Sequence, residues 1–252
     1  MRLAVDIGNS RLAAGLFEAG RLVQRVSVPV IDVSDSTRFF GRREGVTAAV
    51  ACSVAPVLDA AASVAVERET GVRLLFVKRD LAVPLRVDFE NPEEVGADRL
   101  AAALAAHRRF GGAIVADLGT ATTVDAVSPE GEYLGGAIAP GAAMSARALA
   151  EGTELLPEVR PAPPDSPLDR STAAAIRSGL AYGLAGFVDR MVDAIREAVG
   201  AEWPAIATGG GAELMLPFSK RIAEADPDLT LKGALAVLDA HGAGRAGQRE
   251  TA

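Results

Sequence analysis

The sequence predicts an α/β protein built from two halves of similar topology. Of its 252 residues, 49% are hydrophobic and 23% are charged, which is enough apolar material for one large domain or two small ones. An Asp-x-Gly tripeptide ends an apolar segment at Asp6 and again at Asp117, and Gly20 and Pro29 recur at the same offset of 111 residues. This period is too long for a solenoid. We therefore expect two duplicated domains, 1–112 and 113–252.

Each half is expected to begin with a three-stranded antiparallel meander and to continue with helices and further strands. The meander segments are short, mostly apolar and separated by turns that contain glycine. They read LAVDIG, LAAGLF and RLVQRVSV in the first half, and AIVADLG, TVDAVS and EYLGGAIA in the second. Apolar spacing and turn residues then predict helices over 34–43, 56–70, 96–110, 142–149, 172–199 and 230–240, strands over 46–54, 72–77 and 204–207, and a proline-rich loop over 161–167.

Composition excludes several classes of function. Twenty-six Lys and Arg against 33 Asp and Glu leave a net charge of −7, and only 4% of residues are aromatic, so we expect no nucleic-acid partner. One cysteine and two histidines exclude a disulfide framework and a Cys- or His-rich zinc site. Cys52 is expected to be a small buried hydrophobe. No apolar run is long enough for a membrane helix, and Asp6 interrupts the N-terminal one, so a cytoplasmic protein without membrane contact is expected.

The repeated Asp-x-Gly turn is the feature that points to chemistry. Glycine after a strand lets the backbone approach a ligand, and successive turn amides can cradle a phosphate. Asn9 and Ser10, or Thr120 and Thr122, add hydroxyl and amide donors. Asp6 and Asp117 beside phosphate oxygens require a cation between them. One such turn is ordinary turn chemistry, but two in register favour a polyphosphate held from both sides. The P-loop motif Gly-x-x-x-x-Gly-Lys-Ser/Thr does not occur, and no Gly-x-Gly-x-x-Gly stands between an expected strand and an expected helix, where a dinucleotide-binding protein would have it.

The paired turns resemble those of the superfamily of actin, sugar and acetate kinases and heat-shock chaperones, which implies two actin-like (ribonuclease H-like) domains. Within it, five blocks in order from Met1 to about Ala240 resemble type III pantothenate kinases. They are NPEEVGADRLAAALAA, ADLGTATTVDAV, YLGGAIAPG, STAAAIRSGLAYG and IATGGGAE. The resemblance implies ATP-dependent phosphorylation of pantothenate to 4'-phosphopantothenate, the first step of coenzyme A biosynthesis, by a homodimer that uses Mg²⁺-ATP and a monovalent cation.

The same resemblance implies roles for particular residues. Asp98 would be the catalytic proton acceptor, and Gly96, Ala97 and Arg99 would complete the pantothenate-binding block. Phe89 stands where the family usually has tyrosine, so one substrate hydrogen bond is lost, at about 1 kcal/mol. Thr172 would reach substrate from the neighbouring subunit. Asp117 would bind K⁺ or NH₄⁺, and Asp6 would lie near Mg²⁺. The ATP-binding residues would be Asp6, Ile7, Gly8, Asn9, Ser10, Arg11, Leu12, Ala13 and Thr120.

Each role has a simpler alternative. A carboxylate such as Asp98 in the first turn of a helix also complements the helix dipole, Arg99 would suit a surface ion pair, and Thr172 would suit helix capping with Ser171. At the level of the whole chain, one alternative is a catalytically silent relative that acts as a regulatory or binding module, which the retained acidic residues argue against. Another is a sugar kinase or polyphosphate-cleaving phosphatase of the same superfamily. The GADR block at 96–99 disfavours it, and one cysteine is too few for the zinc-binding sugar kinases.

Overall fold

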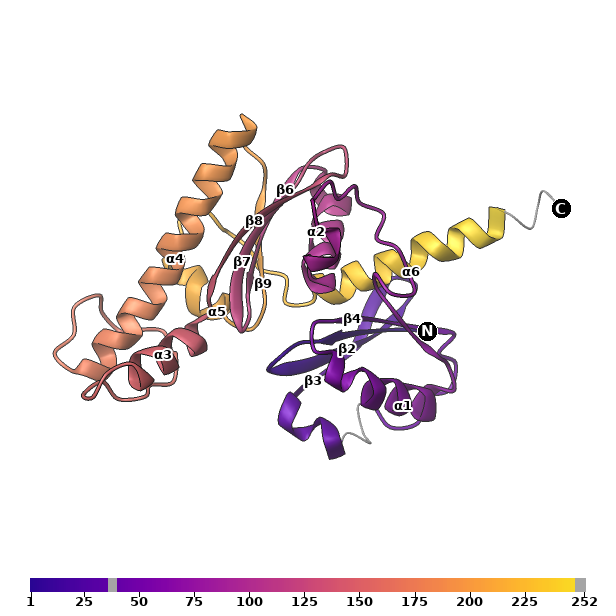
Figure 1. The fold of residues 1–252 in the computed structure, drawn as a ribbon, viewed down its shortest axis with the longest axis horizontal. Helices are drawn as coiled ribbons and strands as arrows, with labels where there is room; N and C mark the ends of the chain where they lie inside the picture. Colours follow the sequence, from indigo (N-terminus) through magenta and orange to yellow (C-terminus); the bar gives the residue numbers. More distant parts are fainter. Residues whose placement is uncertain (36–39, 248–252) are drawn as a thin grey trace. The chain divides into compact units, whose positions relative to one another are not determined.

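The computed structural model describes residues 1–35 and 40–247, which fold into two compact units (Figure 1). The first unit combines residues 1–109 with the last helix, and the second is Phe110–Asp228. The helix expected over 34–43 lies partly outside the described residues. On either side of that gap, Val30–Asp35 forms the short 3₁₀ helix η1, and residues 40–42 form bends without a helix.

The first unit is built on a five-stranded mixed sheet in the order β3-β2-β1-β4-β5. Strands β1 (Arg2–Ile7), β2 (Arg11–Glu18) and β3 (Arg21–Pro29) form the expected antiparallel meander. Strands β4 (Ala48–Ser53) and β5 (Leu74–Phe76) run parallel to β1. Ala19 and Gly20 both have positive φ, the conformation that two-residue hairpin turns require.

Helices cover both faces of this sheet because successive strand residues point to opposite sides. Leu3, Val5 and Ile7 pack with α1 (Asp59–Thr70), which follows the 3₁₀ turn η2 (Pro56–Leu58). Ala4 and Cys52 pack on the opposite face with α2 (Ala97–Phe110) and α6 (Leu229–Gly247). The division expected at residue 112 assigns the last helix to the second half. In the structure α6 instead packs on the first sheet, because its apolar stripe completes the core against β1 and α2.

The second unit repeats the topology on a four-stranded sheet in the order β8-β7-β6-β9. Strands β6 (Ala113–Leu118), β7 (Ala121–Val127) and β8 (Tyr133–Pro140) form an antiparallel meander, and β9 (Ala205–Thr208) runs parallel to β6. A single parallel bridge from Ala207 to Ala225 stands where the first sheet has its fifth strand. The long helix α4 (Thr172–Val199) covers one face, and α3 (Ala142–Glu151) packs against it (Figure 1).

The duplication is confirmed at the level of topology. Strand β6 begins and ends 111 residues after β1, and each lies between an antiparallel and a parallel neighbour. This is the actin-like (ribonuclease H-like) arrangement in both units. The short helices α5 (Ala212–Met215) and η4 (Leu216–Phe218) are additions that the sequence pattern does not predict. Across the described parts of the chain, no helix is both long and apolar enough to cross a membrane.

Candidate active site

The first hairpin turn presents backbone amides and small polar side chains at the end of β1. Gly8 N donates to Arg11 O at 3.0 Å, and Ser10 O accepts from Val30 N at 3.0 Å, so the turn is closed from both sides. A Cβ at Gly8 would lie only 3.0 Å from Arg11 O, which explains the glycine. Asn9 and Ser10 are exposed. Among the expected ATP-binding residues of this turn, Asn9 and Ser10 are the ones whose polar side chains lie at the surface.

The neighbouring expected ATP-binding residues have other contacts. Ile7 and Leu12 are fully buried in the core, so only their backbone can face a ligand. Arg11 Nε and Nη2 donate to the hydroxyl and carbonyl oxygens of Ser27 on β3, each at 3.0 Å. The guanidinium therefore reaches from β2 to the edge strand β3. Ala13 is half-buried within β2 and contributes no polar side chain.

Asp6, Cys52 and Asp98 come together on one face of the first sheet. Asp6 is the register partner of Cys52 across β1 and β4, and α2 brings Asp98 to the same face. Burial raises the pKa of the Cys52 thiol well above its ordinary value, and the negative charges of Asp6 and Asp98 raise it further. Cys52 is thus the small buried hydrophobe that the sequence predicts, and the carboxylates of Asp6 and Asp98 beside it are half-buried.

The first turn of α2 holds the Asp98 carboxylate in place. Arg99 N donates to Asp98 Oδ1 at 2.8 Å, and the positive end of the helix dipole stabilises a carboxylate there. The same oxygen lies over Gly96, where a Cβ would collide with it. A side chain at residue 96 would therefore displace the carboxylate. Ala97, by contrast, points into the core, and Arg99 is half-buried.

Two further expected substrate residues lie on the surface. Phe89 is exposed on the segment that precedes α2. Thr172 is the first residue of α4 in the second unit and is also exposed. The capping role belongs to Ser171, whose hydroxyl accepts from Ala174 N at 3.2 Å, so the Thr172 side chain is not used as the cap.

The second hairpin turn resembles the first but is one residue shorter. Gly119 N donates to Ala121 O at 3.0 Å, and Thr120 O accepts from Gly141 N at 3.1 Å. Thr120 therefore occupies the place of Ser10, immediately before the second strand of the meander. Thr122 was expected to add a donor at this turn, but it lies fully buried inside β7. The shorter turn moves it into the strand, paired with Leu118.

Glycines surround the second turn closely. Gly209, at φ +82°, lies so near Asp117 that a Cβ would collide with Oδ1. Gly211 N donates to Leu118 O at 2.8 Å, and a Cβ at Gly141 would collide with the carbonyl oxygens of Gly119 and Thr120. The triple glycine after β9 thus packs on the hairpin itself. The sequence pattern does not identify Gly141 as part of this turn. Its position directly after Pro140, the last residue of β8, is the signal that could have indicated it.

The Asp117 site has the donor chemistry of a cation site for hard ions. Its carboxylate is half-buried, and the absence of a Cβ at Gly209 lets the backbone there approach Oδ1 closely. Carboxylate and carbonyl oxygens suit K⁺ or a comparable cation. Within residues 1–35 and 40–247, no three His, Cys, Asp or Glu side chains converge on a common point, so any ion here would rely on Asp117 with backbone or ligand oxygens.

Comparison with known proteins decides the family. A family model described as type III pantothenate kinase matches residues 2–194. The chain belongs to the type III pantothenate kinase family. A type III pantothenate kinase of Myxococcus xanthus is 38% identical over 245 residues, which cover 92% of this chain and 96% of that protein. One from Nocardia farcinica is 50% identical over 162 residues, which cover 62% of this chain and 60% of that protein.

Among solved structures, the fold is shared with a protein from Campylobacter jejuni described as a Baf family transcriptional activator. The TM-score is 0.59 at 17% sequence identity, with 95% of this chain and 98% of that chain covered. At this identity the likeness concerns the fold alone.

Proposed function

We propose that this chain performs the reaction of its family with Asp6 on the side of the phosphate donor and Asp98 as the base for the acceptor. The family to which it belongs catalyses the ATP-dependent phosphorylation of pantothenate in coenzyme A biosynthesis. The observation that carries the proposal is the convergence of Asp6 and Asp98 on one face of the first sheet. Asp6 is the penultimate residue of β1, which leads into the turn proposed to bind phosphate, and Asp98 lies in the first turn of α2, within the expected pantothenate-binding block. A kinase needs its phosphate donor and its acceptor base held near each other in this way.

Asp98 is proposed to orient the attacking hydroxyl and take its proton. The pantothenate hydroxyl oxygen attacks the γ-phosphorus, its proton passes to the Asp98 carboxylate, and ADP leaves with its bond to the γ-phosphorus broken. Phosphoryl transfer through a loose transition state depends more on in-line positioning and charge neutralisation than on proton removal. The Arg99 amide and the space above Gly96 keep the carboxylate in one position, which supports the orienting role. Arg99 itself would pair with anionic oxygens of substrate.

The two hairpin turns are proposed to bind the ATP phosphates through their amides, with Asn9, Ser10 and Thr120 adding side-chain donors. Mg²⁺ arrives with ATP and would lie near Asp6. A monovalent cation at Asp117, when bound, would neutralise the carboxylate that otherwise repels the triphosphate. Because ATP is consumed, we expect the reaction to take place in the cytoplasm.

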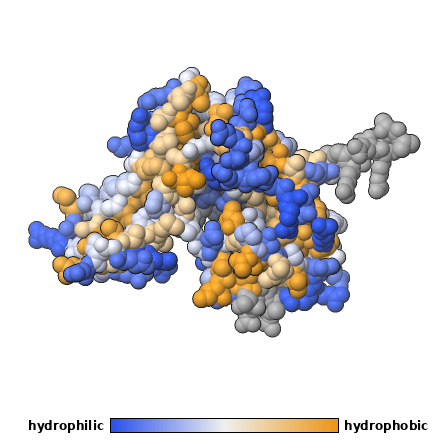
Figure 2. Space-filling model, in the orientation of Figure 1, coloured by the Kyte–Doolittle hydropathy of each residue, from blue (hydrophilic) through white to orange (hydrophobic). Residues whose placement is uncertain are grey.

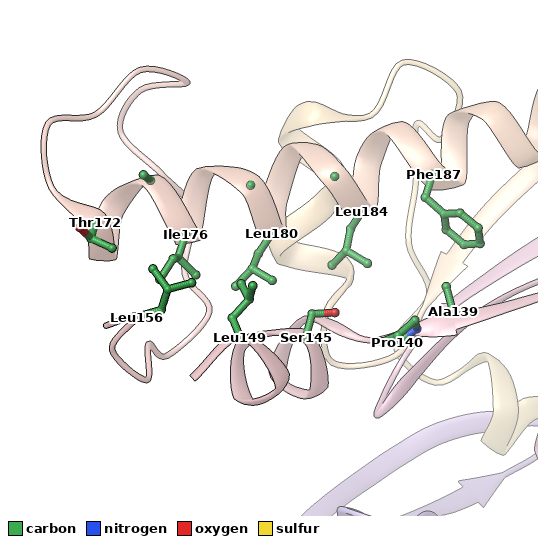
Figure 3. A pocket seen from close by; sticks show the side chains of 13 residues that line it. Ala139, Pro140, Ser145, Leu149, Leu156, Thr172, Ile176, Leu180, Leu184 and Phe187 are labelled. Atoms are coloured by element: carbon green, nitrogen blue, oxygen red, sulfur yellow. The ribbon is translucent and has the colours of Figure 1, made fainter. Parts of the chain in front are cut away.

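We also propose that the chain acts as a homodimer through α4. A groove of about 620 Å³ runs between α3 and α4, with Ile176, Leu180 and Leu184 on one side and Leu149 on the other (Figure 3). Thr172 lies at its end. Exposed small residues, Ala175, Gly179 and Gly183, repeat every four positions along the helix beside it, and apolar side chains gather along α4 in Figure 2. A stripe of this kind lets a second helix approach closely.

Replacement of Gly179 by Glu tests the dimer, because a Cβ there meets no atom within 4 Å in the described chain. The variant should fold normally, elute as a monomer in size exclusion with light scattering, and lose turnover if Thr172 acts across the interface. Glu197→Ala, at an exposed position on the same helix, is the control and should stay dimeric. A wild-type monomer, or a Gly179→Glu dimer with normal rate, would contradict the proposal.

The reaction is tested by ADP release from purified protein with Mg²⁺-ATP and pantothenate in K⁺, NH₄⁺ or Na⁺ buffer. Pantothenate-dependent turnover that is higher in K⁺ or NH₄⁺ is expected. Control reactions contain glucose, or water alone, in place of pantothenate as the acceptor. A sugar kinase would prefer glucose, and a phosphatase would transfer the phosphate to water. No turnover with pantothenate in any cation would overturn the proposed reaction.

A further inference from the structure

Lys78 occupies a backbone conformation that lysine rarely adopts. It follows β5 and has φ +70°, and Ala19 in the β2–β3 hairpin is the one other non-glycine residue with positive φ in the described chain. Lys78 N donates to Leu81 O at 2.8 Å, and Asp80 Oδ2 accepts from Phe76 N at 2.8 Å, which closes a tight turn. L-residues with side chains are strained in this region, and glycine or asparagine usually occupies it. Because glycine would adopt this conformation without strain, the reason that lysine stands here is sought in the contacts of its side chain.

The Lys78 ammonium group donates hydrogen bonds to backbone carbonyl groups of residues 92–95. Nζ donates to the carbonyl oxygens of Pro92 at 3.2 Å, Glu93 at 2.8 Å and Val95 at 2.8 Å. An ammonium has three N–H donors, so all of them are used here. The side chain is 19% exposed, whereas the Glu93 carboxylate 3.5 Å away is 92% exposed. The exposed ion pair adds little, and the main interaction is with the three carbonyl groups.

These carbonyl groups belong to the segment that leads directly into the candidate active site. Pro92–Glu94 form the 3₁₀ turn η3, and Val95 ends it with its side chain buried. The next residues are Gly96, over which the Asp98 carboxylate lies, and Ala97, whose side chain is held in the core. Once residues 92–95 are fixed, little freedom remains for the first turn of α2.

We propose that Lys78 is a positioning residue for pantothenate binding, which holds the η3 carbonyl groups and thereby places Gly96 and Asp98 for the acceptor. The inference rests on the proposed role of residues 96–99 in binding pantothenate. It predicts an effect on pantothenate binding and not on ATP binding, because the three hydrogen bonds of the Lys78 ammonium go to residues 92–95, which precede the expected pantothenate-binding block. A merely stabilising lysine would affect both substrates alike or neither.

Lys78→Met tests this, because methionine keeps the length and apolar stem but removes all three donors. We expect the pantothenate KM to rise at least tenfold, the ATP KM to stay within twofold, and amide hydrogen exchange over residues 91–98 to accelerate at least tenfold. Lys78→Arg, which retains donors, should recover part of the pantothenate affinity. Lys220→Met, at an exposed lysine of the second unit, is the matched control and should behave as wild type.

A second variant separates positioning from general destabilisation. Val66→Ala removes buried methyl groups from α1, which covers the opposite face of the same sheet. It should lower the melting temperature with both KM values unchanged. Unchanged exchange over 91–98 in Lys78→Met, or equal changes in both KM values, would overturn the positioning role. If the wild-type protein fails to phosphorylate pantothenate, the proposed reaction fails, while the exchange experiment still decides whether Lys78 fixes this segment.

Discussion

Gly233 lies where α6 crosses α2, and its replacement by alanine should destabilise the first unit. A Cβ at this position would collide with the carbonyl oxygen and carbon of Ala101. These are backbone atoms of α2, which cannot rotate away as a side chain can, so the two helices must separate. Separation loosens the packing of Leu104 and Leu235 in the core that both helices share.

The size of the effect follows from two opposing contributions. Overpacking a well-packed core costs about 1–3 kcal/mol, whereas alanine is favoured over glycine in a helix by about 1 kcal/mol. A backbone collision lies at the upper end of the first range, so a net loss of about 2 kcal/mol is expected. For a chain of this length that lowers the melting temperature by about 4–8 °C.

Gly242→Ala is the matched control on the same helix, because a Cβ there meets no described atom within 4 Å. It should raise the melting temperature by about 2–4 °C through helix propensity alone. Both variants are compared with wild type by differential scanning calorimetry at one scan rate. A Gly233→Ala protein that melts as high as Gly242→Ala would refute the close crossing of α2 and α6.

Three further predictions concern the candidate active site. Asp98→Asn should lower kcat by about 10²–10⁴-fold with an unchanged circular dichroism spectrum, and a wild-type kcat would remove its assigned role. Gly209→Ala, at φ +82° and against Asp117, should raise the K⁺ concentration needed for half-maximal turnover; an unaltered K⁺ dependence would contradict a cation at Asp117. Because burial and the nearby carboxylates raise the Cys52 pKa in the folded state, the unfolded thiol loses its proton first, near pH 8.5. The free energy of unfolding should therefore fall as pH rises above that value. In urea titrations at pH 7.5 and 9.5, Cys52→Ala should lose less stability than wild type, and equal losses would contradict the shift.

Local sequence signals predict elements well where both ends are marked. Helix α4 has the expected bounds because Ser171 caps its start and Gly200, in the left-handed conformation, ends it. Helix α5 is not predicted because a single turn shows no periodicity. The apolar stripe of α6 is visible in the sequence, but its partner is not. Periodicity shows that a face is buried and leaves open which sheet buries it.

The candidate active site is predictable in part for the same reason. The repeated meander places Asp6 and Asp117 at the ends of equivalent strands. The close approach of Gly209 to Asp117 and the bonding of Arg11 to Ser27 depend on tertiary contacts. The one-residue difference between the two turns is hidden because the next connection is longer in the second unit, where residues 128–132 stand in place of Ala19 and Gly20, so that Gly20 and Gly131 remain at the common offset.

Identification of the reaction product is the most direct test of the central claim that Asp98 and the hairpin turns transfer a phosphoryl group from ATP to pantothenate. The purified protein is incubated with Mg²⁺-ATP and pantothenate in K⁺ buffer, and the products are resolved by mass spectrometry and ³¹P NMR. We predict 4'-phosphopantothenate and ADP in equal amounts from the wild-type protein, and almost none from Asp98→Asn. ADP with free phosphate and unmodified pantothenate, or no ADP at all, would contradict it.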